Sequence, residues 1–430
     1  KRQVQPHMFL QESIIMSKNH EVITFGCRLN SYESEIIRNN LAKSHLTNAV
    51  VINTCAVTKE AEKQARQVIR KIKRQDPSKT IIVTGCAAQN TPEMFASMSE
   101  VSKVLGNEEK LSSSNYFIDE KRIAVNDIMS VKETANHLIT SFEGKARAFI
   151  QVQNGCDHRC TFCMIPYGRG NSRSVPIGVI VQQIRLLLAE NYQEIVFTGV
   201  DVTAYGADLP GKPSFAQMIR RIFALIPNLQ RLRLSSIDVA EIDDELFELF
   251  AYNPRIMPHF HISLQAGDNM ILKRMKRRHN REQVVEFCNK LRVLRPEVSF
   301  GADIIAGFPT ETDEMFENTR RLISEAGLQY LHVFPYSERE GTPAARMPQV
   351  PKQIRKERAA ILRAEGIKEL HKFFTRNVGK DVNVLVEKDN MAHTENFIPV
   401  KLDGKHDAGQ IIKAKLYSFE AEYMLSLIHI

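Results

Sequence analysis

The segment Phe149-Ile-Gln-Val-Gln-Asn-Gly-Cys156-Asp-His-Arg-Cys160-Thr-Phe-Cys163 places three cysteines, in the spacing CxxxCxxC, directly after a predicted strand. Three neighbouring thiolates can hold three irons of a 4Fe–4S cube, which leaves the fourth iron open for a ligand from outside the chain. A structural zinc site is the alternative, but zinc normally takes four protein ligands, and His158 lies inside the CxxxC turn with no second cysteine pair beside it. The spacing therefore favours an iron–sulfur cluster on Cys156, Cys160 and Cys163.

Downstream of this segment, short apolar runs alternate with helical patterns such as residues 281–294. With the run that starts at Phe149, the alternation gives six strands and predicts a partial (β/α)6 barrel, whose chemistry is expected at the carboxyl ends of the strands. One strand carries His259 and His261 on the same face, and for this pair we favour barrel packing or hydrogen bonding to a substrate over a metal site. The predicted strands are residues 149–152, 194–199, 232–236, 260–265, 299–305 and 330–334.

The N-terminal region repeats one pattern three times, a short strand-like run that ends in a cysteine. Such strand–helix alternation predicts a parallel sheet, in which the carboxyl ends of all strands share one edge. The three cysteines then converge, and a metal site, most naturally an iron–sulfur cluster, is favoured over three separate buried core thiols. The runs at residues 21–25, 49–52 and 80–83 precede Cys27, Cys55 and Cys86, and helical segments at 31–43 and 58–74 separate them.

The composition suits a metal-dependent protein of two or three domains. The 430 residues exceed one ordinary core, and seven cysteines, an odd number, argue against a disulfide framework. A net charge of +8 suits a polyanionic partner such as nucleic acid. Neither a membrane-spanning run nor a signal peptide is recognisable, and we therefore expect the protein to be cytoplasmic. We also expect Met16 to be the true start and Cys288 to be an inert core thiol.

Several stretches resemble the radical S-adenosylmethionine (SAM) superfamily and, within it, the methylthiotransferase family. The superfamily resemblance rests on CxxxCxxC after the first barrel strand, and the family resemblance covers nearly the whole chain from about Val22. Arg28 and Thr58 are most similar to the MtaB branch, which acts on threonylcarbamoyladenosine beside the anticodon, whereas the isopentenyladenosine branch typically has Gln and Arg there. The motifs are Gly26-Cys-Arg-Leu-Asn30, Asn53-Thr-Cys-Ala-Val-Thr58, and Asn154-Gly-Cys156 through Pro166-Tyr-Gly-Arg-Gly170 to Arg173-Ser174.

The resemblance implies separate roles for the two cysteine sets. Cys156, Cys160 and Cys163 would hold the 4Fe–4S cluster that cleaves SAM, and the N-terminal three would hold a second 4Fe–4S cluster that carries the sulfur to be donated. One SAM would methylate that sulfur, and another would generate the radical that takes hydrogen from carbon 2 of adenine. We further predict SAM contacts at the strand ends, from Thr198, Gly199, Ser236, Gln265, Ala306 and Gly307.

The resemblance also implies three domains. These are an N-terminal three-layer parallel-sheet domain (20–140), the partial barrel (141–375), and a small OB-like β-barrel similar to the RNA-binding TRAM domain (376–430), for which a β-rich cap is the alternative. The ending Leu425-Ser-Leu-Ile-His-Ile430 resembles a translated transposon end, so we expect a truncated barrel that lacks its last strand. The runs that predict strands in this domain are residues 382–386, 396–402 and 410–416.

Two basic clusters are candidate RNA contacts, with a solvated surface as the alternative for each. The implied partners are the anticodon stem-loop of tRNA, a reductant such as flavodoxin or ferredoxin, and a sulfur donor that the sequence does not name. The alternatives are methylthiolation of isopentenyladenosine or of a ribosomal protein side chain, and a non-catalytic iron–sulfur RNA-binding redox sensor. The basic residues are Lys63, Arg66 and Arg70 in the first cluster, and Lys273, Arg274, Lys276 and Arg277 in the second.

Overall fold

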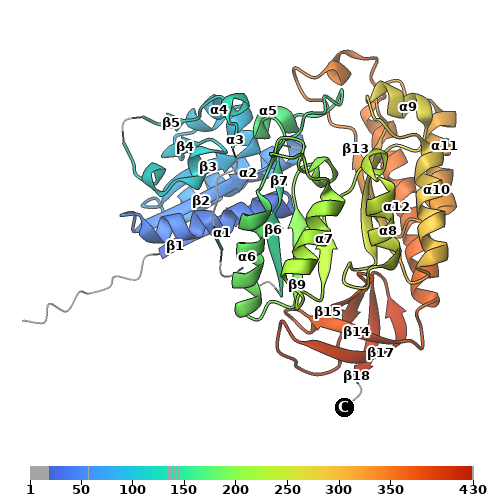
Figure 1. The fold of residues 1–430 in the computed structure, drawn as a ribbon. Coiled ribbons are helices and arrows are strands. Elements are labelled where there is room, and N and C mark those ends of the chain that lie inside the picture. The colour runs from blue at the N-terminus through green and yellow to red at the C-terminus, as the bar shows by residue number, and fades with distance from the viewer. Residues whose placement is uncertain are drawn as a thin grey trace, which may run out of the picture.

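The computed structural model describes residues 19–56, 58–119, 121–133, 138–139, 142 and 146–428. These residues form an N-terminal parallel sheet flanked by helices, a central half-barrel, and a small closed barrel near the C-terminus (Figure 1). In Figure 1 the N-terminal unit (blue and cyan) lies beside the half-barrel (green to orange), and the C-terminal barrel (red) lies below it. The predicted fold class is therefore confirmed in its three parts.

The N-terminal unit is a five-stranded parallel sheet covered by helices on both faces. Its elements are β1 Asn19–Thr24, α1 Arg28–Lys43, β2 Asn48–Thr54, α2 Lys59–Gln75, β3 Thr80–Gly85, α3 Cys86–Asn90, α4 Pro92–Ala96, β4 Lys103–Leu105 and β5 Ile123–Ala124. The strands follow one another in the order β1-β2-β3-β4-β5. Val50 and Ile52 of β2 join a core with α2, and Val51 joins a core with α1, because successive side chains of a strand point to opposite faces.

The strands and helices that the sequence predicts in this unit are all present. β4 and β5 escaped prediction because they are only three and two residues long. Runs of this length carry no readable period, and their pairing with β3 and with each other makes them strands.

The half-barrel contains all six predicted strands. They are β6 Arg147–Gln151, β9 Glu194–Thr198, β10 Leu232–Leu234, β11 His259–Gln265, β12 Ser299–Ala306 and β13 Tyr330–Pro335. Parallel pairing joins β6, β9 and β10 into one row and β11, β12 and β13 into another. Two single bridges, Leu232 to Ile256 and Ile237 to Ile262, connect the rows. Within the described ranges no pairing joins β6 to β13, so the row stays open on that side.

Helices cover the outside of this row, and their ends follow local capping rules. Ser214 and Asn280 start α7 and α10 with reciprocal capping boxes, and Thr312 caps α11.

None of the described helices is long and apolar enough to cross a lipid bilayer. The helices are α5 Ile165–Arg169, α6 Ile177–Ala189, α7 Phe215–Leu225, α8 Asp244–Tyr252, α9 Asn269–Arg274, α10 Arg281–Leu294, α11 Asp313–Ala326 and α12 Lys352–Thr375, and the short strands β7 Gln153–Asn154 and β8 Arg173–Ser174 pair beside α5.

The C-terminal barrel is closed, and the expectation that it lacks its last strand is wrong. Its strands are β14 Asp381–Val386, β15 Met391–Thr394, β16 Pro399–Lys401, β17 Ile411–Glu420 and β18 Tyr423–Ile428, in the cyclic order β14-β15-β16-β18-β17. β18 includes residues 425–428 of the segment that resembles a transposon end. Met424 and Ser426 are buried there while Leu427 is exposed, and this alternation is that of a half-buried strand.

Phe397 of the C-terminal barrel closes the amino-terminal end of the half-barrel. Its ring stacks on His259, with 4.6 Å between ring centroids. The guanidinium groups of Arg147 and Arg233 lie 5.1 and 5.0 Å from the same ring centroid. Phe397 has a φ of 69°, a costly conformation for a bulky residue, which these stacking and cation–π contacts offset. The half-barrel lumen therefore has a floor at this end.

A buried ionic cluster joins the N-terminal unit to the half-barrel. Glu33 on α1 lies 2.7 Å from Arg169 on α5 and 2.7 Å from Lys110, and all three side chains are almost fully buried. Although burial raises it, the two cations hold the pKa of Glu33 at about 2. On the opposite rim, Arg339, which follows β13, lies 2.9 Å from Glu62 on α2. The N-terminal unit thus contacts both sides of the open half-barrel.

We predict that Glu33→Gln lowers the free energy of unfolding by about 3–5 kcal/mol, because Arg169 and Lys110 then remain as buried cations without their carboxylate. Since the folded-state pKa of Glu33 lies below its unfolded value of 4.5, the stabilisation is present above that pH and lost as the pH falls toward 2. Urea unfolding followed by circular dichroism at neutral pH measures the effect.

Glu60→Gln is the matched control for this measurement. Its side chain is 63% exposed and 4.0 Å from Lys63, so we expect a change below about 0.5 kcal/mol. Equal urea midpoints for the two variants would show that the buried cluster contributes no more than a surface pair.

Candidate metal centres

Cys27, Cys55 and Cys86 lie at one edge of the N-terminal sheet. Cys27 caps α1, Cys55 follows β2, and Cys86 opens α3. Because β1, β2 and β3 are adjacent and parallel, their carboxyl ends share this edge. Gly26, at a φ of 107°, allows the close approach: a Cβ there would lie 2.9 Å from the Cβ of Cys55. The geometry places the three thiols where the strand pattern predicts them.

Polar groups surround this first cysteine set. Asn107 Nδ2 lies 3.7 Å from the sulfur of Cys86. Burial lowers the pKa of Arg169, but the charges of Cys86, Glu33 and Cys27 raise it well above its usual value.

Cys156, Cys160 and Cys163 lie in the loop after β7, and all three are partly accessible. The backbone amide of Cys163 donates to the carbonyl of Cys160 at 3.1 Å, which turns the loop back on itself. Burial raises the pKa of Cys156 and of Cys163 to about 12, and the Asp201 carboxylate adds to the shift at Cys156. These two thiols therefore keep their protons at neutral pH until a metal displaces them.

Helix α5 connects the two cysteine sets. It begins two residues after Cys163, and Gly168 near its end contacts Cys86: a Cβ on Gly168 would lie 3.2 Å from the Cβ of Cys86. Five residues of chain span at most about 18 Å even when fully extended. Both sets therefore open on the same region between the two units.

The donor groups fit iron–sulfur clusters better than zinc. Each set offers three thiols, and Cys288, the remaining cysteine, is buried in α10, where burial raises its pKa to about 12, as expected of a core thiol. His158 is already held by Asp201 at 2.9 Å and Glu241 at 3.4 Å. Among the described residues a zinc ion on Cys156, Cys160 and Cys163 thus finds no uncommitted fourth ligand, whereas a 4Fe–4S cluster leaves one iron open by design.

An acidic group beside the CxxxCxxC loop was missed by the sequence analysis. Asp201, Asp238 and Glu241 follow β9 and β10 at the barrel edge that carries the cysteines. Arg277 links them to the loop, with 3.7 Å to the sulfur of Cys160 and 3.0 Å to Asp238. Hydrogen bonds to Asp201 and Glu241 raise the pKa of His158 to about 10, so its ring is charged at neutral pH. The sequence could have indicated Asp201, Asp238 and Glu241 through their position just after predicted strands.

The residues predicted to contact SAM all lie at or just past the carboxyl ends of β9 to β12, at the cysteine edge. They do not all face the lumen. A Cβ on Gly307 would meet the side chain of Arg355 on α12 at 2.6 Å, so this glycine serves helix packing. A Cβ on Gly199 would lie 2.7 Å from the carbonyl of Gln153. The six residues are Thr198, Gly199, Ser236, Gln265, Ala306 and Gly307.

The two histidines of the predicted HxH pair have different surroundings. His259 packs on Phe397 at the floor and lies 2.8 Å from Ser299 Oγ. His261 lies 3.1 Å from Asp303 Oδ1, and His332 lies 3.1 Å from the same oxygen. Asp303 and His332 were not predicted, because they reach this cluster from neighbouring strands, β12 and β13.

The two predicted RNA-contact clusters differ in how their side chains are used. The first (Lys63, Arg66 and Arg70) lies on α2, and its side chains reach solvent. In the second, Arg274 donates to Thr310 Oγ1 at 2.8 Å, and Arg277 is held in the acidic group described above. Lys273 and Lys276 remain exposed.

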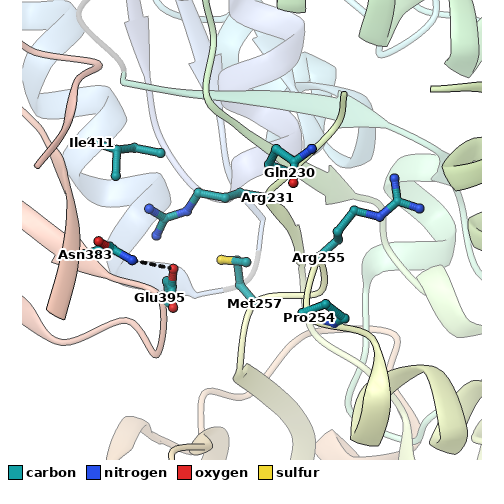
Figure 2. Close-up of a pocket in the computed structure, with 8 residues that line it drawn as sticks. All are labelled: Gln230, Arg231, Pro254, Arg255, Met257, Asn383, Glu395 and Ile411. Atoms are coloured by element: carbon teal, nitrogen blue, oxygen red, sulfur yellow. Dashed lines mark hydrogen bonds between the residues drawn. The ribbon is translucent and has the colours of Figure 1, made fainter. Parts of the chain in front are cut away.

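Figure 2 shows a pocket of about 340 Å³ between the half-barrel and the C-terminal barrel. The Arg231 side chain extends toward Asn383 and Glu395, which are hydrogen-bonded at 3.5 Å. Arg231 directly precedes β10, so the pocket lies at the amino-terminal ends of the strands. It is therefore separate from the cysteine edge.

Comparison with known proteins gives consistent results. Residues 150–323 match the radical SAM superfamily, and residues 19–106 match a family described as uncharacterized protein family UPF0004. The chain is 69% identical to the threonylcarbamoyladenosine tRNA methylthiotransferase MtaB of Rickettsia prowazekii, over 96% of this chain and 99% of the relative. It is 37% identical to the protein of the same name from Aquifex aeolicus, over 91% and 98%.

Among solved structures, the radical SAM methyltransferase TsrM from Kitasatospora setae aligns with a TM-score of 0.55 at 14% identity, over 77% of each chain. At this identity the likeness concerns the fold alone.

We predict that Cys160→Ala and Cys27→Ala each remove about four of about eight iron atoms per chain after anaerobic reconstitution, because each change takes one of three ligands from a separate cluster. The double variant then binds almost none. Iron and sulfide analysis with visible absorption measures the loss.

Cys288→Ala is the control for these variants, since its thiol is buried in α10 away from both sets. It should retain the iron content of the parent protein. Full iron content in Cys160→Ala or in Cys27→Ala would refute the assignment of that ligand set.

Proposed function

The chain belongs to the MtaB family of radical SAM methylthiotransferases, and we propose that it converts N6-threonylcarbamoyladenosine next to the anticodon of tRNA to its 2-methylthio derivative. The superfamily implies a 4Fe–4S cluster and SAM as cofactors. The match covers 99% of the R. prowazekii relative, so the comparison extends through all three structural units.

The convergence of two three-cysteine sets on one region supports a second cluster. α5 begins two residues after Cys163, and its Gly168, at most about 18 Å along the chain from Cys163, contacts Cys86. Transfer of a sulfur-containing group requires the sulfur source and the reacting carbon to be held close together. An arrangement with the sets on different faces would not serve this reaction.

When bound, the two clusters and SAM supply one-electron chemistry and sulfur for a C–H bond that has no easily removed proton. Cys156, Cys160 and Cys163 would hold the SAM-binding cluster, and the N-terminal set would hold the sulfur-carrying one. Arg277 contacts Cys160 of the CxxxCxxC set, and Arg169, at the end of α5, is held by Glu33.

The remaining chain residues shape the space for the ligands. We assign SAM contacts to the strand ends at Thr198, Ser236, Gln265 and Ala306, with Gly199 and Gly307 keeping the backbone close to its neighbours. Phe397 closes the lumen floor and so helps to exclude water from a reactive intermediate.

RNA contacts are assigned to the exposed lysines and arginines of α2, to Lys273 and Lys276, and to the C-terminal barrel. The closed barrel supports this role, since small five-stranded barrels of the OB type bind single-stranded nucleic acid. We propose a small electron-transfer protein such as flavodoxin or ferredoxin as reductant, and action on tRNA in the cytoplasm.

Mass spectrometry of tRNA nucleosides tests the function directly. The full chain is expressed in a strain that lacks its own methylthiotransferases. We predict a methylthio increment on threonylcarbamoyladenosine, which disappears with Cys27→Ala or Cys160→Ala and persists with Cys288→Ala.

Other outcomes would redirect the assignment. An increment on isopentenyladenosine instead would overturn the choice of base and keep the chemistry. SAM cleavage without any modified nucleoside would favour a protein substrate such as a ribosomal side chain.

We also predict that Lys63→Gln, Arg66→Gln and Arg70→Gln together weaken binding of a tRNA anticodon stem-loop and flatten its salt dependence. Each lost phosphate contact reduces the slope of log Kd against log salt by about 0.7–0.9. The control removes three exposed lysines of α12 (Lys356, Lys368 and Lys372) and should leave the slope unchanged. Identical slopes for the two triple variants would exclude α2 from the RNA interface.

A further inference from the structure

A buried guanidinium group lines the pocket between the half-barrel and the C-terminal barrel. It belongs to Arg231, which directly precedes β10 and whose side chain is only 4% exposed. Figure 2 shows this side chain extending from the half-barrel toward Asn383 and Glu395 on the opposite wall of the pocket. A fixed positive charge in such a position decides which ligands the pocket accepts.

The terminal nitrogens of Arg231 are buried donors without acceptors. Within the described part of the chain, neither Nη1 nor Nη2 has a hydrogen-bond partner. The guanidinium does lie near one carboxylate, since its Nε is 3.2 Å from Oε2 of Glu194. Buried donors are paired in the great majority of cases, so two unpaired nitrogens on one charged group call for an acceptor from outside the chain.

Glu194 does not neutralise Arg231 alone, because a second arginine already holds it. Arg233 donates from Nε to Glu194 Oε1 at 2.7 Å and from Nη2 to Oε2 at 3.1 Å, which engages both carboxylate oxygens. Arg147, a further cation at this end of the half-barrel, is paired separately with Glu387 at 2.7 Å. Two arginines thus share one buried carboxylate. A positive charge remains that the described residues do not balance, and burying such a charge is costly unless an anion joins it.

The other charged residues of the pocket do not provide that anion. Arg255 is committed to the end of α7, where its guanidinium donates to the carbonyls of Phe223 at 3.2 Å and Ile226 at 3.3 Å. Glu395 is exposed and accepts from Asn383 at 3.5 Å, and among the described residues it forms no ion pair with Arg231. The pocket, of about 340 Å³, therefore combines a buried cation with room for a small ligand.

We propose that this pocket is an anion site, in which Nη1 and Nη2 of Arg231 bind a phosphate group. The guanidinium fork matches two oxygens of a phosphate. Free phosphate esters and the phosphodiesters of RNA offer the same chemistry, and a net charge of +8 suits both. The site lies at the amino-terminal ends of the strands, away from the cysteine edge, so it is a second ligand site of the protein. Since the half-barrel and the C-terminal barrel form its two walls, a bound phosphate strengthens their contact.

Inorganic phosphate is the first probe, added to the full chain and compared with chloride at equal ionic strength. Thermal unfolding is followed by circular dichroism. At about twenty times its dissociation constant, phosphate should raise the unfolding midpoint of the parent protein by about 2–4 °C. Phosphate also stabilises proteins in general through its exclusion from their surface, so the comparison between variants decides the result.

Arg231→Gln should lose this shift except for the general effect of the salt. The variant keeps the bidentate pair of Arg233 with Glu194, so we expect it to fold. Lys43→Gln is the matched control: it removes the same charge from the exposed end of α1 and should retain the full shift.

Glu395→Gln tests the site from the opposite direction. It removes a negative charge that repels an anion while it leaves an acceptor for Asn383. The affinity for phosphate should therefore rise by about two- to fivefold. Because Glu395 is exposed, this measurement remains decisive if Arg231→Gln proves unstable.

An unmodified anticodon stem-loop RNA separates the two sources of the phosphate. If an RNA phosphate occupies the site, Arg231→Gln should weaken RNA binding by about 5- to 20-fold, and inorganic phosphate should compete with RNA only in the parent protein. Equal RNA affinity in the two proteins, together with the phosphate-dependent shift, would assign the site to a small phosphate compound. Equal shifts in the parent protein and in Arg231→Gln, or an unchanged phosphate affinity in Glu395→Gln, would overturn the proposal. None of these measurements depends on the methylthiolation reaction, so the proposed function is tested separately.

Discussion

The buried carboxylate of Glu33 is the contact on which the geometry of both cysteine sets depends. It joins Arg169, at the end of α5, to Lys110 of the N-terminal unit, and Asn107 accepts from that lysine at 2.6 Å. Three buried charges are tolerated only when their hydrogen bonds are completed, and directional bonds of this kind permit one docking geometry. Arg169 belongs to α5, which begins two residues after Cys163 and whose Gly168 contacts Cys86, so the interaction that docks the two units lies between the two cysteine sets.

A half-barrel needs such docking more than a closed barrel does. Its open side exposes the lumen, and the N-terminal unit meets both rims, through Glu33 on one side and through Glu62 and Arg339 on the other. Phe397 closes the floor. All three units of the chain are therefore needed to enclose the lumen of the half-barrel. This explains why the family motifs are scattered from Gly26 to Ser174.

The sequence predicted those features that depend on neighbouring residues. The long strands, α1, α2 and the cysteine positions follow from local period and spacing. The rest depends on long-range contacts: β4, β5, β15 and β18 become strands only through their partners, and the segment of β18 was misjudged because its composition resembled foreign sequence. The cluster of Asp303 and His332 joins different strands, so no single stretch could reveal it, although alternation along the HxH strand placed His259 and His261 on one face.

The charged groups beside the CxxxCxxC loop hold one another in place. Beside the CxxxCxxC loop the three carboxylates of the acidic group each have a cationic partner: Asp201 has His158, Asp238 has Arg277, and Glu241 has Arg278 at 2.5 Å. Such a satisfied set is rigid and keeps the cysteines in place. On the half-barrel strands Asp303 holds both His261 and His332 at 3.1 Å, while the His332 side chain is still 61% exposed.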